Sequence, residues 1–221
     1  MFPPPIFFPD INLNLAEVLL RRATVTGSAD KIAVIGIREG QDEVERISWS
    51  LLRDRVRQVY DAMLNYGIRA GDRVATVICN TVDTMVISLA TLALGAIYSS
   101  TSPDMGADAI IQRFGQIKPK LVFTETAYIY GGKKISLSGC INEWSPKLLS
   151  DGRERCRVVL LPYQGTYPRG VDEPCSWENF LALGSGQPLQ FKQLPFSTPA
   201  FILFTSGTVC SAHTFLLIAY H

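Results

Sequence analysis

Residues 74 to 100 decide the fold, and they open with Val74-Ala75-Thr76-Val77-Ile78-Cys79. This nearly continuous apolar run is typical of a strand that is covered on both faces. An apolar segment of helix length, 82–94, follows and ends at Gly95, after which 96–100 has the composition of a second strand. The order strand, helix, strand at this spacing predicts a parallel pair with a right-handed crossover.

The same alternation continues downstream of this unit. The apolar positions of 108–117 recur at helical spacing and Pro119 ends that helix, after which 121–124 and 157–161 are strand-like runs. A short capped helix is expected over 175–181. Alternating helices and buried strands favour an α/β fold, with a mostly parallel sheet and flanking helices.

Upstream of residue 74, the sequence predicts two helices and a hairpin. Asn14 is placed to cap a helix over 15–22, and Ser48 to cap a long amphipathic helix that ends at Tyr66 before Gly67. Between these helices, the β-branched runs 33–37 and 43–48 indicate a β-hairpin. Residues 1–13 then form an extended lead-in.

Residues 127–154 carry the weakest pattern. Gly131, Gly132, Gly139 and Pro146 argue against a long regular element, although a short helix around Asn142 or Lys147 is compatible with the sequence.

Composition excludes several classes of partner and site. Lys plus Arg (21) balance Asp plus Glu (20), so we expect neither a nucleic acid nor an anionic membrane as a partner. The five cysteines lack metal-binding spacing, and both histidines lie in the last nine residues, so we predict no metal site. The longest apolar stretch, 85–98, is shorter than the about 20 residues that span a bilayer. A soluble cytoplasmic protein is expected.

Chemistry is expected at Thr205-Ser206-Gly207-Thr208, which follow the apolar run Phe201-Ile202-Leu203-Phe204. Small hydroxyl residues around a glycine suit a loop that wraps N–H groups and hydroxyls around a phosphate. In α/β sheets, ligands bind beyond the carboxyl ends of the strands, where this loop falls. An ordinary turn at the end of a strand is the alternative.

This loop and several upstream segments together resemble the adenylate-forming (acyl-CoA synthetase) superfamily. The matching segments are Leu13-Asn14-Leu15-Ala16-Glu17, Gly71-Asp72-Arg73-Val74, Leu94-Gly95-Ala96-Ile97-Tyr98, Ser102-Pro103-Asp104, 113–120 and 204–208. Within the superfamily, the set looks most like the acetoacetyl-CoA synthetases, and next most like the acetyl-CoA and propionyl-CoA synthetases. The resemblance implies that 14–208 is part of the large N-terminal AMP-binding domain of that fold.

The resemblance also implies a function. Members of this superfamily activate a short-chain carboxylate such as acetoacetate with MgATP and pass the acyl group to coenzyme A. Thr205, Ser206, Gly207 and Thr208 match positions around the β- and γ-phosphates of ATP. Lys133, in Tyr130-Gly131-Gly132-Lys133, matches a segment that contacts coenzyme A; a solvated surface turn is the alternative reading. No residue is nominated as catalytic.

The match fails after Thr208, where Val209 and Cys210 replace a hydroxyl residue and glycine and no Pro-Lys follows. Losing the loop lysine and the second glycine is expected to weaken nucleotide binding about ten- to a hundredfold. We therefore assign 209–221 as a divergent tail and expect the chain to be a truncated, catalytically inactive relative. A non-catalytic fragment and an unrelated α/β nucleotide-binding module remain open, as do the acyl substrate and the oligomeric state.

Overall fold

The structure, a computed structural model, describes residues 8–149, 156–163, 167, 175–204 and 214–218. Its centre is a seven-stranded sheet in the order β10-β9-β6-β4-β5-β12-β13. The strands are β10 (Cys175–Ser176), β9 (Arg157–Leu161), β6 (Leu121–Glu125), β4 (Arg73–Val77), β5 (Ile97–Thr101), β12 (Pro199–Phe204) and β13 (Thr214–Ile218). All neighbouring pairs are parallel except β12–β13. The predicted α/β fold with a mostly parallel sheet is confirmed.

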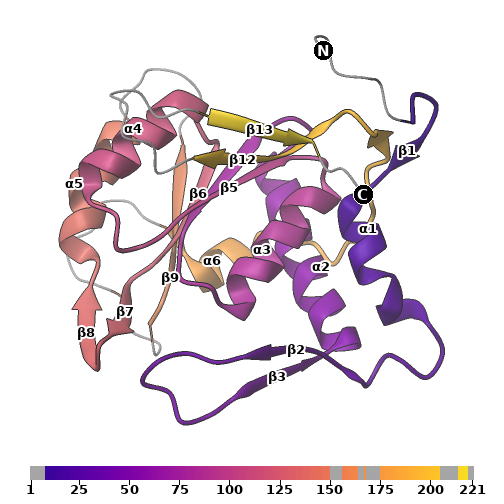
Figure 1. Cartoon of the computed structure of the whole chain (residues 1–221), viewed down its shortest axis with the longest axis horizontal. Helices are drawn as coiled ribbons and strands as arrows, with labels where there is room; N and C mark the ends of the chain where they lie inside the picture. The colour runs from indigo at the N-terminus through magenta and orange to yellow at the C-terminus, as the bar shows by residue number, and fades with distance from the viewer. Residues whose placement is uncertain (1–7, 150–155, 164–166, 168–174, 205–213, 219–221) are drawn as a thin grey trace.

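Helices cover the sheet on both faces (Figure 1). One face carries α1 (Leu15–Leu20), α2 (Trp49–Tyr66), α3 (Val82–Ala93) and α6 (Trp177–Leu181), and the other carries α4 (Ala107–Ile117) and α5 (Ser138–Leu149). Each layer of helices shares its own apolar cluster with the sheet, one containing Ile87 and Phe180 and the other Phe114 and Trp144. The central strands are therefore buried on both sides, which explains their continuous apolar runs.

Four polar side chains start the helices on the sheet face that α2 and α3 cover. Asn14, Ser48, Thr81 and Ser176 each accept the backbone N–H of the residue three positions later. Gly67 ends α2 in the left-handed region, at φ 102°. The predicted helix over 15–22 is divided into α1 and the 3₁₀ turn η1 (Arg21–Thr24). Local capping chemistry thus sets these helix boundaries.

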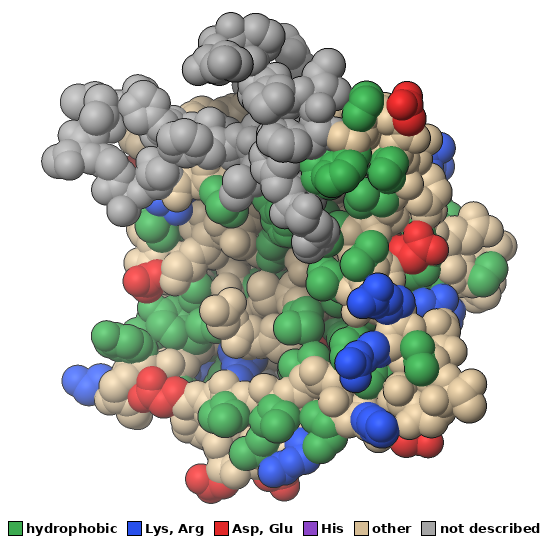
Figure 2. Space-filling view, turned by 45° about the vertical axis from the view of Figure 1, so that its right-hand side comes forward, with side chains coloured by type: hydrophobic (Ala, Val, Ile, Leu, Met, Phe, Trp, Pro, Cys, Tyr) green, Lys and Arg blue, Asp and Glu red, His purple; other side chains and the backbone are tan. Residues whose placement is uncertain are grey.

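Two hairpins and a short strand pair lie outside the main sheet. The predicted hairpin is present as β2 (Ile32–Gly36) and β3 (Glu45–Ser48). Figure 1 draws this hairpin at the bottom of the molecule, and Figure 2 shows apolar side chains along the same lower rim. The exposed apolar residues of the hairpin include Ile32 and Ile35. The others are β7 (Ala127–Tyr130) with β8 (Lys133–Ser136), and β1 (Asn12–Leu13) with β11 (Leu194–Pro195).

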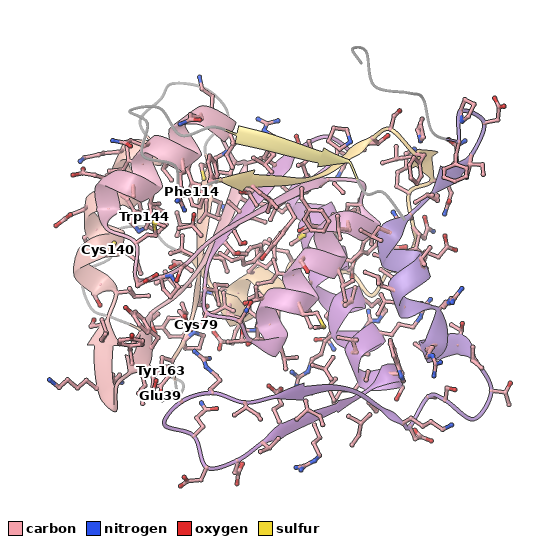
Figure 3. All side chains as sticks on the ribbon, in the orientation of Figure 1. Glu39, Cys79, Phe114, Cys140, Trp144 and Tyr163 are labelled. Atoms are coloured by element: carbon pink, nitrogen blue, oxygen red, sulfur yellow. The ribbon has the colours of Figure 1, made fainter. Side chains whose placement is uncertain are left out.

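The expectation that residues 127–154 hold no long regular element was wrong, although the helix that the sequence allowed around Asn142 or Lys147 is present. Instead of an irregular segment, the chain forms the β7–β8 hairpin and then the 12-residue helix α5, with Pro146 inside it. Trp144 is fully buried and belongs to the same apolar cluster as Phe114 of α4 (Figure 3). A proline removes one helical hydrogen bond. Burial of a tryptophan against the neighbouring helix offsets that loss, an effect that the local sequence does not reveal.

At the other end of the chain, β13 lies within the segment assigned as a divergent tail and pairs antiparallel to β12. Within the part of the chain that the structure describes, no helix is both long and apolar enough to cross a membrane.

Candidate functional site

The carboxyl ends of the parallel strands form one edge of the sheet. The register places Val77 of β4 opposite both Thr101 of β5 and Thr124 of β6, and it places Glu125 opposite Leu161 of β9. Ligands of open α/β sheets bind beyond this edge. We therefore take the carboxyl edge as the candidate site.

The strand β12 ends at this edge, and the predicted phosphate residues that follow it in the sequence, Thr205, Ser206, Gly207 and Thr208, lie outside the described residues. The strand that leads to them is firmly placed. The Ser99 hydroxyl donates a hydrogen bond to the Ile202 carbonyl at 2.9 Å, and the rings of Tyr98 and Phe201 meet edge to face at 6.3 Å. These contacts fix β12 against β5, so that the loop would start from a rigid base.

Arg113 of α4 lies where β5 and β12 end. Its guanidinium donates to the Thr101 hydroxyl at 3.2 Å and stacks 5.3 Å from the centre of the Phe204 ring. A positive charge is thus held beside the residue that precedes Thr205. The sequence placed Arg113 in a matching segment but gave it no role.

Glu125 is the central charged group of the edge. It is 2% exposed, its carboxylate pairs with Arg38 at 2.5 Å, and it accepts the Cys79 backbone N–H at 2.7 Å. A buried carboxylate requires such partners, because leaving water without them is costly. Glu125 therefore joins the end of β6 to the end of β4 and to the connection between β2 and β3. Sequence reasoning missed both Glu125 and Arg38; the only signal was a charged residue at the end of an otherwise apolar strand.

Two ionisable groups beside Glu125 are kept neutral. Burial, together with the hydrogen bond and charge of Glu125, raises the pKa of the Cys79 thiol to about 12. Burial also raises the pKa of the Tyr128 phenol, with a contribution from the charge of the exposed Asp104. The Cys79 thiol therefore stays protonated at neutral pH, which agrees with its interpretation as a packing residue rather than a nucleophile.

The Gly131-Gly132 pair forms the tight turn between β7 and β8. Both glycines have positive φ, 59° and 74°, as a two-residue hairpin turn requires. Tyr130 and Lys133 are cross-strand partners at this turn and both are exposed. The turn that the sequence offered as the alternative reading is therefore present. The contact between Lys133 and coenzyme A stays a prediction.

The β7–β8 turn is held against the rest of the edge around Tyr163, which follows β9. Arg38 and Lys134 lie 5.5 and 5.1 Å from the centre of the Tyr163 ring, and Glu39 accepts the Gly132 N–H at 2.7 Å. Because alternate strand residues face opposite sides, Lys133 lies on the other face of the hairpin from Lys134.

The edge is suited to positioning an anionic ligand. Arg113, Lys133 and Lys134 place cationic groups around it, whereas the charge of Arg38 is balanced by its ion pair with Glu125. Guanidinium and ammonium groups stabilise transferring phosphoryl groups by charge. Among the described residues, no group of three His, Cys, Asp or Glu is placed to hold a metal ion. Magnesium is often bound mainly through substrate phosphates, so this observation is compatible with a magnesium–nucleotide substrate.

Comparison with known proteins identifies the family of the chain. Residues 21–209 match the family model described as AMP-binding enzyme. The chain is 38% identical over 216 residues to an acetoacetyl-coenzyme A synthetase of Rhizobium meliloti, and 36% identical over 223 residues to an acetoacetyl-CoA synthetase of Rattus norvegicus. These matches cover 94% and 95% of this chain but only 31% and 32% of the relatives. The chain thus spans about a third of the length of the curated relatives it matches.

The same similarity is found in three dimensions. The solved structure of an acetoacetyl-CoA synthetase from Streptomyces lividans superposes with a TM-score of 0.86 at 31% identity, covering 97% of this chain and 32% of that one. The residues matched by the family model, 21–209, include the strands that form the carboxyl edge.

Proposed function

Because the chain belongs to the AMP-binding enzyme family, we propose that it carries the phosphate-binding part of an acid–thiol ligase that converts acetoacetate to its coenzyme A thioester. The observation that supports this most is the similarity to acetoacetyl-CoA synthetases over nearly the whole chain, in sequence and in fold. ATP, with Mg²⁺, and coenzyme A are the co-substrates of the proposed reaction, and the cytoplasm is its proposed location.

The proposed reaction has two steps. A carboxylate oxygen of acetoacetate attacks the α-phosphorus of ATP, and the bond to diphosphate breaks, leaving an acyl-adenylate. The sulfur of coenzyme A then attacks the acyl carbon, its proton is released, and the bond to AMP breaks. The first nucleophile is already ionised at neutral pH. This step needs positioning and charge stabilisation more than proton transfer, which suits the cationic edge.

Within this proposal, hydroxyl and N–H groups of Thr205, Ser206, Gly207 and Thr208 contact the β- and γ-phosphates. Arg113, fixed by Thr101 and Phe204, supplies a positive charge at the base of that loop. The exposed Lys133 contacts a phosphate of coenzyme A.

A different short acid is the second candidate substrate. The chain is also 34% identical over 216 residues to a malonamoyl-CoA synthetase of Penicillium aethiopicum, covering 29% of that relative. Both relatives are CoA synthetases, so they share the reaction class and differ in the acyl group.

Binding of a fluorescent ATP analogue to the purified chain, in the presence of Mg²⁺, tests the nucleotide part of the proposal. Thr205→Val and Gly207→Val are each expected to weaken binding about three- to tenfold, through loss of a phosphate contact or of close backbone approach. Thr198→Val, at the other end of the β12 segment, is the matched control and should leave binding unchanged. An acetoacetyl-adenylate analogue should displace the probe better than the acetyl and malonamoyl analogues.

Absence of binding, or equal binding by all four proteins, would contradict the proposed phosphate site. Coenzyme A is tested separately with Lys133→Gln, for which about a threefold loss of affinity is expected at low salt. Lys31→Gln, at an exposed lysine that precedes β2, is its control.

A further inference from the structure

A charged motif outside the candidate site begins where α1 ends. It consists of Arg21-Arg22-Ala23-Thr24-Val25, so that two arginines lie three and two residues before a threonine and an apolar residue follows it. Arginine-directed serine/threonine kinases select substrates by this pattern, because acidic side chains of the kinase pair with the two guanidinium groups and an apolar pocket takes the following residue. The next hydroxyl residues, Thr26 and Ser28, have no arginine at these distances.

The motif is displayed on the surface of the molecule. The side chains that a kinase would read, those of Arg21, Arg22, Thr24 and Val25, all belong to exposed residues, and Val25 is 52% exposed. None of the four residues of η1 is buried. Figure 1 draws α1, from which η1 continues, on the opposite side of the molecule from the β7–β8 hairpin. The motif therefore lies away from that turn of the candidate site.

The charges of the two arginines are not engaged elsewhere. Within the described part of the chain, neither guanidinium has a carboxylate at ion-pair distance or an acceptor at hydrogen-bond distance. Arg55 and Arg57 of α2, by contrast, pair with carboxylates at 2.7 and 2.9 Å. Both charges of the motif can thus meet an acidic partner without breaking a contact of the fold.

Little holds the threonine in place. To enter an active site, Thr24 must leave η1, where its hydroxyl donates to the Arg21 carbonyl at 2.9 Å and the Val25 N–H donates to the Arg22 carbonyl at 3.3 Å. Hydrogen bonds that water can replace contribute little net stability. Segments without buried apolar contacts open at low free energy. The exposed turn can therefore open while the rest of the fold stays intact.

A second segment has a similar charge pattern but is held by the fold. In Lys133-Lys134-Ile135-Ser136-Leu137, two lysines precede a serine at the same distances. Ser136 pairs with Ala127 in the β7–β8 ladder, and Leu137 is only 5% exposed. A kinase could reach this serine only after the hairpin had opened and a buried leucine had left its place. The structure thus separates two segments that the sequence alone does not.

We propose that Thr24 is a phosphorylation site for an arginine-directed serine/threonine kinase. The Thr24 hydroxyl oxygen attacks the γ-phosphorus of MgATP bound to the kinase, the bond to the ADP oxygen breaks, and the hydroxyl proton passes to the catalytic aspartate of the kinase. The phosphate adds about 1.5 to 2 negative charges, which balance the two arginines. This site does not depend on the proposed ligase function.

The test incubates the purified full chain with radiolabelled MgATP and the catalytic subunit of cyclic-AMP-dependent protein kinase, an arginine-directed enzyme. Incorporation is measured as an initial rate, and mass spectrometry locates the phosphate. One phosphate is expected, on Thr24. Thr24→Ala should abolish incorporation and Thr24→Ser should restore it. Thr26→Ala and Ser136→Ala are the matched controls and should be phosphorylated like the unmodified chain.

The two arginines are tested in the same assay. Arg21→Gln and Arg22→Gln should each lower kcat/KM about tenfold or more, since each removes a charge-assisted hydrogen-bonding group. Arg46→Gln, at an exposed arginine of β3, has the same change in net charge outside the motif and should leave kcat/KM unchanged.

Three results would overturn the proposal: no incorporation into the full chain, a phosphate located on Thr26, Ser28 or Ser136 in place of Thr24, or unchanged kcat/KM in both arginine variants. Each variant is compared with the parent by circular dichroism. Because none of the residues of η1 is buried, all are expected to keep the parent fold.

Discussion

Two buried carboxylates, Asp61 and Glu125, are equally hidden from water, each 2% exposed, yet they are satisfied in different ways. Asp61 lies on α2 and receives the backbone N–H groups of Gly186 at 2.7 Å and Gln187 at 3.1 Å. Glu125 lies at the carboxyl edge and is held mainly by the Arg38 guanidinium. The Asp61 carboxylate is therefore satisfied by hydrogen bonds from a loop, and the negative charge of Glu125 is balanced by the positive charge of Arg38.

The difference separates a structural role from a role at the site. Asp61 also accepts from the Asn65 amide and the Ser185 hydroxyl, so it fixes the 184–187 turn to α2, in the apolar layer. Glu125 joins three segments that border the candidate site, and its charge acts on the Cys79 thiol. Removing the Asp61 carboxylate should therefore lower the stability of the fold alone, whereas changes at Glu125 should also alter the segments at the carboxyl edge.

The largest effect is expected from Asp61→Ala. It leaves the Gly186 and Gln187 N–H groups without their acceptor inside the protein, at a cost of about 3 kcal/mol or more in unfolding free energy. Urea denaturation measures this loss. Asp54→Ala removes an exposed carboxylate from the same helix, paired with Arg57 at 2.9 Å, and should cost less than about 1 kcal/mol. Equal losses in the two variants would refute the role given to Asp61.

Glu125→Gln is expected to rank second, with a loss of about 1 to 3 kcal/mol, because it keeps one acceptor for the Cys79 N–H but leaves Arg38 without its counter-charge. Hydrogen exchange should accelerate in residues 37–42, which the ion pair anchors. A double-mutant cycle with Arg38→Met isolates the pair. A coupling energy near zero would show that Glu125 acts through its contact with the Cys79 backbone N–H alone.

Gly132→Ala should cost about 1 kcal/mol, because alanine is unfavourable at a φ of 74°. The strain falls on the β7–β8 turn, where the Gly132 N–H donates to Glu39. The contact between this turn and the carboxyl edge should therefore weaken, while the region around Asp61 is unchanged. Thermal unfolding gives the cost. Gly139→Ala, in α5, has no steric conflict with the described atoms and is the control expected to be neutral or stabilising.

The smallest effect is a change in thiol reactivity. Glu125→Gln removes a charge that raises the pKa of Cys79, so that pKa should fall from about 12, while burial keeps it above its ordinary value. Alkylation of Cys79 at pH 8 to 9 should then accelerate several-fold, since the thiolate is the reactive form. Cys156 is the internal control, because burial alone raises its pKa to about 12. Parallel acceleration at both thiols would indicate general loosening instead.

The sequence predicted the elements whose cause is local. Asn14, Ser48 and Gly67 set helix ends through contacts with near neighbours in the chain, and the continuous apolar run at 74–79 indicated a strand buried on both faces. The full length of α5 was not predicted because the burial of Trp144 depends on α4, which lies elsewhere in the chain. Local preference is readily overridden by such tertiary packing.

The charged groups of the site were harder to predict for the same reason. Arg38 and Glu125 are 87 residues apart, and Asp61 meets Gly186 across 125 residues. In the sequence of α2, Asp61 is a polar residue next to an apolar stripe. Its burial is explained only by the 184–187 turn, which covers it in the structure. By contrast, the motif at 204–208 is contiguous, so the resemblance could nominate it as a phosphate loop, which stays a prediction. The resemblance gave no role to the arginines or to the glutamate at the carboxyl edge.

Hydrogen exchange of the chain with and without MgATP tests the central claim, that the carboxyl edge is the ligand-binding edge, most directly. The account predicts protection in peptides that cover 201–208 and the ends of β4 to β6, with little change around the 184–187 turn held by Asp61. Uniform protection, or protection confined to the opposite edge of the sheet, where β4 and β6 begin, would contradict it.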